Sequence, residues 1–486
     1  MKGVRPMPIL WTAAEAAQAM RGSAAGAWAA TGVSIDSRTV APGDLFFAIK
    51  GPSHDGHAFI DDALAAGAVA AVVSTSAETG GVDPKKLLHV ADTMKALENL
   101  AKAARARSSA RIAAVTGSVG KTGTKESLKL ALSAVAGETG VTATQGNLNN
   151  HWGLPLSLAR LPETAAYGVF EMGMNHPGEI APLSRMCRPH VSIITTIADT
   201  HSEFFNSLAD IADAKAEIFE GMKPDGVAIL NFDNEMFDRL ASAARAAGLR
   251  VVSFGVAVEA DWRLADIQLH SSFSEITATY WGQICRYTLG VPGRHLALNS
   301  LAVLAAIEAL GADVERSAAG LADMAGLAGR GKRHGVELAN GSFQLIDESY
   351  NASPASMRAA IDVLGGVEPA GNGRRIAVLG DMLELGPQAE KLHRGLARPL
   401  ADAGIDLVFT AGQYMSALWD ALPQTMRGGH ACTAEKLVPL VTAAIRPGDV
   451  VTVKGSLGSR TRQIVEALLA LNQTRDGASG RVVNGS

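Results

Sequence analysis

The segment from residue 111 to residue 122 constrains the fold more than any other part of the sequence. It begins with the mostly apolar run RIAAVT, which Gly117 ends, and a helical pattern follows a few residues later. An apolar run that ends in glycine predicts a buried parallel strand. A strand that leads through glycines into a helix is typical of a phosphate-binding loop, because the glycines let backbone N–H groups converge on phosphate oxygens.

Six consecutive residues form the predicted phosphate loop: Gly117, Ser118, Val119, Gly120, Lys121 and Thr122. Lys121 supplies a positive charge, and Thr122 can place its hydroxyl on Mg²⁺. The loop is shorter than the common G-x-x-x-x-G-K-[ST] pattern, because Val115 stands where that pattern has its first glycine. The alternative is a glycine-rich strand-to-helix turn with a surface lysine, and the preceding strand favours the phosphate loop.

Strands and helices alternate beyond this loop. Further short apolar runs at 169–171, 191–197 and 226–230 are each followed by a polar loop and a helical pattern. This alternation predicts a doubly wound sheet, whose ligands lie at the carboxyl ends of the strands. Residues 250–292 change character, and within them polar and apolar side chains alternate at 275–280, which predicts antiparallel hairpins at the edge of the same domain.

Three α/β domains are predicted. At roughly 150 residues per domain, 486 residues correspond to about three. We expect a small substrate-binding α/β domain over 1–93, and a central doubly wound, P-loop ATPase-like domain over 94–328 that opens with a helix. Apolar runs between 343 and 453 predict a Rossmann-like domain over 329–486, with a disordered tail after 472. The glycine-bearing segment 329–333 is the predicted hinge.

Composition excludes several classes of protein. Lys and Arg total 44 against 48 Asp and Glu, a formal net charge of -4, which argues against a protein that coats nucleic-acid phosphates. The longest apolar stretches fall short of the ~18 residues of a membrane-spanning helix. The three cysteines are far apart and form no C-x-x-C pair, and the N-terminus is a poor signal peptide. We therefore expect a cytoplasmic protein that neither binds nucleic acid nor inserts into a membrane.

Three more residues are expected at the same sheet edge as the phosphate loop. Glu171 ends one predicted strand, and His201 lies just past another. A carboxylate and an imidazole are possible neighbours of Mg²⁺, although a histidine beside a loop is often only solvated or packed. Lys215 shares an apolar helical stripe with Ile211 and Ile218. It either reaches solvent at the rim or, with a lowered pKa, is carbamylated by carbon dioxide and becomes an anionic metal ligand.

One helix face further along is a candidate base-binding surface. His295 and Asn299 are four residues apart on a predicted helix, and small residues such as Ala302 and Ala306 continue that face. Small residues allow close helix packing, or they leave room for a nucleotide base with the Asn299 amide reading its edge.

Taken together, these residues resemble the Mur ligase family, ATP-dependent amide-forming enzymes of peptidoglycan synthesis, from about residue 30 to about residue 470. The short phosphate loop is similar to the family's own version. The resemblance implies that Glu171, His201 and carbamylated Lys215 bind magnesium with Thr122, and that Lys121, His201 and Lys215 act in catalysis. It also implies nucleotide contacts for Asn299, Arg330 and Asp347.

Within the family, the segments 146–155, 171–180 and 347–354 most resemble members that add D-alanyl-D-alanine to UDP-N-acetylmuramoyl-tripeptide through an acyl phosphate. This implies ATP and two Mg²⁺ ions as cofactors, small-molecule substrates and, we expect, a monomer. The substrate contacts that it implies are Ser37, Arg38, Asn147, Asn149, Asn150, Tyr350, Asn351, Lys454 and Arg460.

Two alternatives remain open from the sequence. Another amide ligase of the same architecture, a tripeptide-forming family member or a folylpolyglutamate synthase, would share the phosphate loop and Lys215 but not the segment with Tyr350 and Asn351. A nucleotide-binding regulatory or scaffold protein would keep the fold without turnover. The joint presence of Lys121, Glu171, His201 and Lys215 argues against the second alternative.

Overall fold

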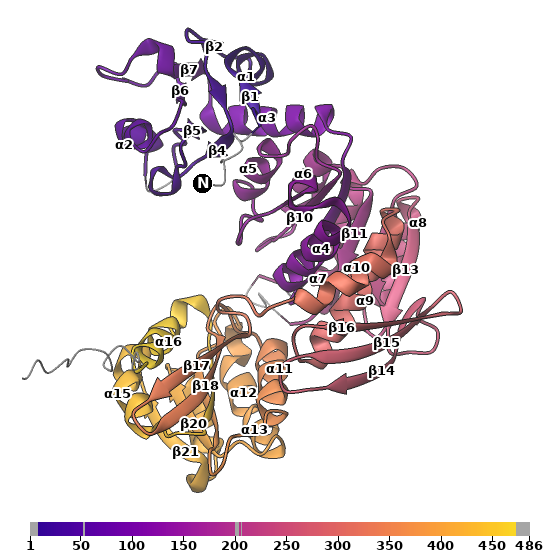
Figure 1. The fold of residues 1–486 in the computed structure, drawn as a ribbon, viewed down its shortest axis with the longest axis vertical. Coiled ribbons are helices and arrows are strands. Elements are labelled where there is room, and N and C mark those ends of the chain that lie inside the picture. Colours follow the sequence, from indigo (N-terminus) through magenta and orange to yellow (C-terminus); the bar gives the residue numbers. More distant parts are fainter. Residues whose placement is uncertain (1–7, 52–53, 200–203, 206, 473–486) are drawn as a thin grey trace, which may run out of the picture. The chain divides into compact units, whose positions relative to one another are not determined.

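The computed structural model describes residues 8–51, 54–199, 204–205 and 207–472 (Figure 1). These residues form two compact units. The first unit comprises the chain up to residue 196, together with 211–262 and 301–320, and the second comprises 197–210, 263–300 and the chain from 321 onward.

A small, mostly parallel sheet forms the N-terminal part of the first unit. Its strand order is β2-β7-β6-β5-β4, in which β4 to β7 run parallel and β2 pairs antiparallel with β7. Phe46 and Val73 lie in its buried core. The elements are β1 (Trp11–Thr12), α1 (Ala13–Met20), β2 (Ser23–Ala24), β3 (Ala29–Ala30), β4 (Gly32–Ser34), β5 (Asp44–Phe47), α2 (Ile60–Ala65), β6 (Ala70–Ser74), β7 (Leu87–Val90) and α3 (Thr93–Arg107).

A second sheet in this unit carries six parallel strands in the order β9-β10-β8-β11-β12-β13. The strands are β8 (Arg111–Thr116), β9 (Val141–Ala143), β10 (Tyr167–Glu171), β11 (Val191–Ile194), β12 (Val227–Asn231) and β13 (Arg250–Gly255). The helices are α4 (Lys121–Ala136), α5 (Gly153–Ala159), α6 (Ile180–Cys187), α8 (Phe237–Ala246) and α10 (Val314–Gly320), together with α7 (Leu208–Ala216) and α9 (Arg294–Ala309), whose first residues belong to the second unit. β8 lies inside this sheet, which is why all its residues after Arg111 are buried.

The strand order makes this sheet doubly wound. The chain moves one way from β8 to β9 and the opposite way from β9 to β13, so right-handed crossovers place α4 on one face and α5, α6 and α8 on the other. The packing agrees, because α4 contacts α10 whereas α5 and α6 contact α3. The predicted fold class is confirmed. The prediction of hairpins throughout 250–292 was wrong at its start, because β13 pairs parallel to β12.

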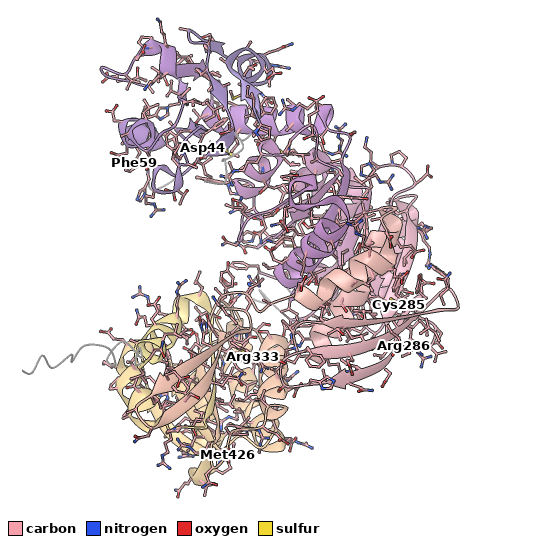
Figure 2. All side chains as sticks on the ribbon, viewed as in Figure 1. Asp44, Phe59, Cys285, Arg286, Arg333 and Met426 are labelled. Carbon is pink, nitrogen blue, oxygen red and sulfur yellow. The ribbon has the colours of Figure 1, made fainter. Side chains whose placement is uncertain are left out.

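An antiparallel hairpin in the second unit confirms the rest of that prediction. The strands are β14 (Trp262–Leu269), β15 (Ser274–Tyr280) and β16 (Gln283–Leu289), and β15 pairs antiparallel with β16. Cys285 and Arg286 are neighbours on β16, so their side chains point to opposite faces, and the first is half-buried while the second is exposed (Figure 2).

The C-terminal sheet has the order β17-β18-β22-β19-β20-β21, with β17 antiparallel to β18 and the other pairs parallel. Its strands are β17 (Lys332–Leu338), β18 (Gly341–Glu348), β19 (Arg375–Gly380), β20 (Leu407–Ala411), β21 (Arg427–Ala431) and β22 (Val450–Lys454). Its helices are α11 (Pro354–Gly365), α12 (Ala389–Arg394), α13 (Ala397–Asp402), α14 (Met415–Ala421), α15 (Ala434–Ala444) and α16 (Arg462–Leu469). Successive residues of β19 enter two different cores, one on each face.

The cysteines, the lengths of the helices and the C-terminal tail bear on further expectations from the sequence. None of the three cysteines, all within the described residues, forms a disulfide. No helix in the described part of the chain is both long and apolar enough to cross a membrane. The predicted tail after residue 472 lies outside the described residues, and the division into three domains stays a prediction.

Candidate functional site

The phosphate loop joins β8 to α4, as the sequence predicts. β8 ends at Thr116 and α4 begins at Lys121, so four residues make the turn. Gly117 has φ +145° and Gly120, which precedes the helix, has φ 89°. Both values lie where side chains with a Cβ are strained, so the backbone of this loop requires its two glycines.

Residues after β11 hold the loop from the side. The Thr195 hydroxyl donates to the carbonyl of Val119 over 2.6 Å, and the Ser118 N–H donates to the Thr196 carbonyl over 2.8 Å. A Cβ on Gly117 would come within 1.9 Å of Thr195 Oγ1. The loop therefore fits against the end of β11 only with glycine at this position.

Lys121 lies at the first turn of α4 with its ammonium over the loop. Its Nζ donates to the carbonyl oxygens of Gly117, at 2.7 Å, and Ser118, at 3.2 Å. These bonds keep the positive charge beside the loop backbone. A phosphate placed at this helix N-terminus would meet both the Lys121 charge and the positive end of the α4 dipole.

Thr122, Glu171 and Asn149 form a hydrogen-bonded cluster next to the loop. The Thr122 hydroxyl donates to Glu171 Oε2 over 2.9 Å, and the Asn149 amide donates to Oε1 of the same carboxylate over 2.7 Å. Glu171 ends β10 and is 1% exposed. The structure thus brings together Thr122 and Glu171, which are predicted to bind a metal ion, and Asn149, which is predicted to contact the substrate.

Lys215 is buried on α7, with 2% of its surface exposed. Burial lowers the pKa of its amine well below the ordinary value of 10.5, and repulsion from Lys121 lowers it further, while Glu217 opposes the shift. Glu217 itself accepts the backbone N–H groups of Gly178, Ile180 and Ala181 at the start of α6. The solvent-reaching alternative for Lys215 is therefore wrong, and a neutral amine is the form that reacts with carbon dioxide.

The donor set can be tested against Mg²⁺. This ion prefers oxygen ligands, and Thr122 and Glu171 offer a hydroxyl and a carboxylate 2.9 Å apart. The residues present fit one ion at this position. His201 lies outside the described residues, and within the described part of the chain no cluster of three His, Cys, Asp or Glu side chains suits a metal.

The predicted substrate contacts Ser37 and Arg38 lie in the N-terminal part of the first unit. Ser37 and Arg38 lie in a 3₁₀ turn after β4, and the Arg38 guanidinium makes a two-point contact with Asp36 at 2.7 and 2.9 Å. The Arg38 side chain is 85% exposed. Asp36 therefore holds a cation that remains accessible to a ligand.

The predicted substrate loop between β9 and α5 contains Asn147, Asn149 and Asn150. Asn150 Oδ1 accepts the N–H groups of Trp152, at 3.1 Å, and Gly153, at 3.0 Å, so its side chain supports the start of α5. Asn147 is exposed, and its carbonyl accepts the Asn149 N–H over 2.8 Å. Of these three residues, Asn149 is the one that contacts Glu171.

In the second unit, Asp347 organises the predicted hinge. Its Oδ2 accepts the Gly329 N–H over 2.8 Å, and its Oδ1 accepts the N–H and the hydroxyl of Ser349 at 3.1 and 2.6 Å. The guanidinium of Arg330 lies 4.1 Å from the ring centre of Tyr350. These contacts place the Arg330 guanidinium against the Tyr350 ring and join the Asp347 carboxylate to the backbone of Gly329.

Lys454 lies at the end of β22 and is 3% exposed. Its Nζ donates to the Asn351 carbonyl over 2.9 Å and to Glu348 Oε2 over 3.3 Å, so it connects β22 to the segment with Tyr350 and Asn351. Arg460 has a left-handed φ of 55° and is exposed. Asn299 lies on α9 and is half-buried.

Sequence reasoning missed several residues that shape the first-unit site. Thr195 holds the phosphate loop, Glu217 holds the start of α6, and Lys125 is a second fully buried lysine on α4. Lys125 falls on the same helical face as the buried Leu128 and Leu132. The apolar-stripe argument that identified Lys215 would have found it.

Family models match most of the chain. The Mur ligase family catalytic domain matches residues 29–105, the Mur ligase middle domain matches 115–307, and the Mur ligase glutamate ligase domain matches 329–457. The second match includes the phosphate loop, Glu171 and Lys215, and the third begins at Gly329, whose N–H donates to Asp347.

Relatives of known sequence and structure agree with the family models. The UDP-N-acetylmuramoyl-tripeptide--D-alanyl-D-alanine ligase of Rickettsia prowazekii (strain Madrid E) is 36% identical over 438 residues, which cover 89% of this chain and 94% of the relative. A crystal structure of MurF from Acinetobacter baumannii is 30% identical, with a TM-score of 0.80, and the match covers 96% of this chain and 100% of that one. MurF ligase from Thermotoga maritima, solved in complex with ADP, is 28% identical, with a TM-score of 0.73 and coverage of 90% and 97%. The chain belongs to the Mur ligase family.

Proposed function

We propose that this protein is an ATP-dependent ligase that joins D-alanyl-D-alanine to UDP-N-acetylmuramoyl-tripeptide and releases ADP and phosphate. The observation that carries the proposal is the hydrogen-bonded cluster of Thr122, Glu171 and Asn149 beside the phosphate loop. The cluster joins Thr122 of the phosphate loop to Asn149 of the expected substrate loop. The choice of substrates is supported by relatives of that name that match about nine-tenths of the chain.

The reaction has to activate a carboxylate, because a carboxylate oxygen is a poor leaving group. The terminal carboxylate of the tripeptide attacks the γ-phosphorus of ATP, the bond from that phosphorus to the bridging oxygen of ADP breaks, and an acyl phosphate forms. The amine of D-alanyl-D-alanine then attacks the acyl carbon, an amide bond forms, and phosphate leaves with an oxygen of the original carboxylate. Bringing both reactants together in line supplies much of the rate enhancement.

The residues of the first unit position the phosphates. Lys121 and the N–H groups of the loop stabilise the charge on the transferring phosphoryl group, and Asn149 orients the Glu171 carboxylate that faces Thr122. Mg²⁺ bound by Thr122 and Glu171 would neutralise phosphate charge. By analogy with removal of one preorganised donor, replacing Lys121 with methionine is expected to cost about 2.7–4 kcal/mol of transition-state stabilisation.

Lys215 is proposed to be carbamylated. Its neutral amine attacks carbon dioxide, a C–N bond forms, and loss of the proton leaves an N-carboxylate in place of a cation. The lowered pKa caused by burial and by Lys121 supports this step, because it favours the nucleophilic amine. The carbamate and His201 are proposed to hold a second Mg²⁺ ion. Together with Lys121, which stabilises the transferring phosphoryl group, His201 and Lys215 are the proposed catalytic residues.

The remaining predicted residues are proposed to bind substrates. Ser37 and Arg38, with Asn147 and Asn150, would bind the UDP-linked tripeptide. In the second unit, Asn299, Arg330 and Asp347 would contact the nucleotide, and Tyr350, Asn351, Lys454 and Arg460 the dipeptide. We further propose that the enzyme acts as a monomer. We also propose that it is cytoplasmic, since three cysteines without a disulfide are typical of a reducing compartment.

An omission experiment tests the proposed function. The protein is incubated with ATP, Mg²⁺, the nucleotide tripeptide and D-alanyl-D-alanine, and each component is omitted in turn while phosphate and product mass are measured. The pentapeptide product should form only in the complete mixture. Rapid phosphate release with neither acceptor present would contradict the proposal, and product formation with an amino acid in place of the dipeptide would favour another ligase of this family.

A further inference from the structure

Lys125 is a buried lysine that takes no part in the proposed mechanism. It lies on α4, one helical turn after Lys121, and its side chain is 0% exposed. A buried ammonium is costly unless it is paired and hydrogen-bonded. Its contacts therefore indicate what this position contributes.

The two hydrogen-bond partners of the Lys125 ammonium differ in exposure. Its Nζ donates to the carbonyl oxygen of Thr144 over 2.7 Å and to Oε1 of Glu126. The Glu126 side chain is 31% exposed, so its carboxylate is partly solvated, whereas the bond to Thr144 is buried. Lys125 thus connects the interior of α4 to the residue that follows β9.

Thr144 in turn holds Glu171. Its hydroxyl accepts the Glu171 backbone N–H over 3.1 Å, and its own N–H donates to the Val169 carbonyl over 3.0 Å. Lys125 therefore contacts the backbone of Thr144. The Thr144 side chain in turn holds Glu171 at the end of β10.

The helix consequently reaches Glu171 by two routes. Thr122 contacts the carboxylate directly, and Lys125 acts on the backbone through Thr144. Thr144 also begins the loop that carries Asn149, the donor to the other carboxylate oxygen. The Lys125 ammonium thus anchors the Thr144 backbone, which positions both Glu171 and the loop that carries Asn149.

We propose that Lys125 is a positioning residue that sets the Glu171 carboxylate against Thr122 and thereby tunes the affinity of this site for a divalent cation. This inference rests on the proposed role of Thr122 and Glu171 in binding Mg²⁺. Lys125 contacts neither substrate nor metal in this account, and it acts through Thr144.

The first test is Lys125→Met, which keeps a long apolar side chain and leaves Glu126 able to regain water. ADP binding is measured by calorimetry at a series of Mg²⁺ concentrations, together with the kinetics. The half-saturating Mg²⁺ concentration should rise about 10- to 100-fold, as for other residues that orient metal ligands. The KM for D-alanyl-D-alanine should change less than about twofold, because only the metal and phosphate site is affected.

Lys129→Met is the matched control. Lys129 lies on the same helix one turn later, with a side chain that is 38% exposed and 4.0 Å from Glu138. This variant should leave the Mg²⁺ dependence unchanged. An equal effect of both variants would show a general loss of positive charge and would overturn the inference.

Thr144 gives an independent variant in case Lys125→Met fails to fold. Thr144→Val keeps the shape and the carbonyl that Lys125 contacts but loses the hydroxyl that accepts the Glu171 N–H. It should raise the Mg²⁺ requirement in the same way, and Thr144→Ser should restore the wild-type value. A normal Mg²⁺ dependence in Thr144→Val would overturn the inference.

Glu171→Gln separates failure of this inference from failure of the proposed function. If Glu171→Gln raises the Mg²⁺ requirement while folded Lys125→Met does not, the metal site stands and the role of Lys125 falls. If Glu171→Gln leaves the Mg²⁺ dependence unchanged, the metal assignment falls and the inference falls with it.

Discussion

The hydroxyl of Thr122 donates to Oε2 of Glu171 over 2.9 Å, and this bond joins the first turn of α4 to the carboxyl end of β10. The two residues are 49 positions apart in the sequence. Their meeting follows from the sheet order, because β10 pairs directly with β8 and parallel strands end at the same edge. Asn149 occupies the other carboxylate oxygen, so the orientation of the Glu171 side chain is fixed from both sides.

Thr122→Val should therefore separate nucleotide binding from metal use. The variant keeps the shape of the side chain but loses the hydroxyl that faces Glu171. We expect the half-saturating Mg²⁺ concentration for ATP turnover to rise at least about tenfold. Thr122→Ser is the control and should stay near the wild-type value. A Val variant with unchanged Mg²⁺ dependence would remove Thr122 from the metal site.

Gly117→Ala should destabilise the phosphate loop. An added Cβ meets Thr195 Oγ1 at 1.9 Å, and φ is +145°, so the substitution costs about 1–3 kcal/mol and weakens ADP binding. Urea denaturation and calorimetry measure the two effects. Thr195→Ala in the same chain removes the collision but not the backbone strain, so the double variant should remain less stable than Thr195→Ala alone.

Gly123→Ala provides the comparison for that experiment. Gly123 lies inside α4, and an added Cβ there meets nothing within 4 Å. Alanine should raise the free energy of unfolding by roughly 0.5–1 kcal/mol, since glycine is unfavourable inside a helix. Equal destabilisation by both alanine substitutions would contradict the special role of the Gly117 backbone.

The buried amine of Lys215 should make stability depend on pH. Its pKa in the folded protein is lowered below the ordinary value of 10.5, so between these two values the unfolded chain binds more protons. The free energy of unfolding should therefore rise with pH across this window and level off above 10.5, in carbon dioxide-free buffer. Lys215→Met should lack this rise. Parallel pH curves for the two proteins, measured by urea denaturation, would contradict the lowered pKa.

The same residue should carry the carbamate in the presence of bicarbonate. ¹³C-labelled bicarbonate should give a carbamate carbon signal in the NMR spectrum of the wild-type protein, and Lys215→Met should lack it. Lys215→Ala should lose activity that short-chain carboxylates partly restore. Full activity of Lys215→Ala without added carboxylate would disprove the carbamate.

Asp347→Asn should destabilise the segment around Gly329 in the second unit. The carboxylate accepts three hydrogen bonds, from the Gly329 N–H and from the N–H and hydroxyl of Ser349, and an amide with one oxygen cannot accept all of them. We expect a loss of about 1–3 kcal/mol in thermal or urea unfolding. Ser349→Ala removes one of the three bonds and should cost less. A larger loss for Ser349→Ala would show that this segment does not depend on Asp347.

The sequence was sufficient for the parts of the site that depend on local pattern. The strand that ends at Thr116, the glycines of the phosphate loop and the apolar helix face that carries Lys215 all follow from apolar runs and helical spacing. Glu171 could be placed at the right sheet edge because parallel strands present their carboxyl ends together. The bonds from Thr122 and Asn149 to its carboxylate depend on side-chain geometry, which no spacing predicts.

Other features escaped prediction because their local signals are weak. β21 has the sequence RGGHA, and its two glycines hide a strand that pairs at a sheet edge. β17 is largely polar and lies at the opposite edge, where solvent permits such residues. The hairpin prediction is wrong for β13, because the alternation of polar and apolar side chains lies at 275–280 and does not reach back to this strand. The contact between Lys125 and Thr144 could not be predicted, because the partner atom is a backbone carbonyl 19 residues away.

The central claim is that the tripeptide carboxylate is phosphorylated by ATP before the dipeptide amine attacks. The most direct test uses a nucleotide tripeptide whose terminal carboxylate carries ¹⁸O at both oxygens, with ATP and D-alanyl-D-alanine, and measures the mass of the released phosphate. The account predicts one ¹⁸O atom in each phosphate and one in the new amide. Unlabelled phosphate released together with the pentapeptide product would contradict it.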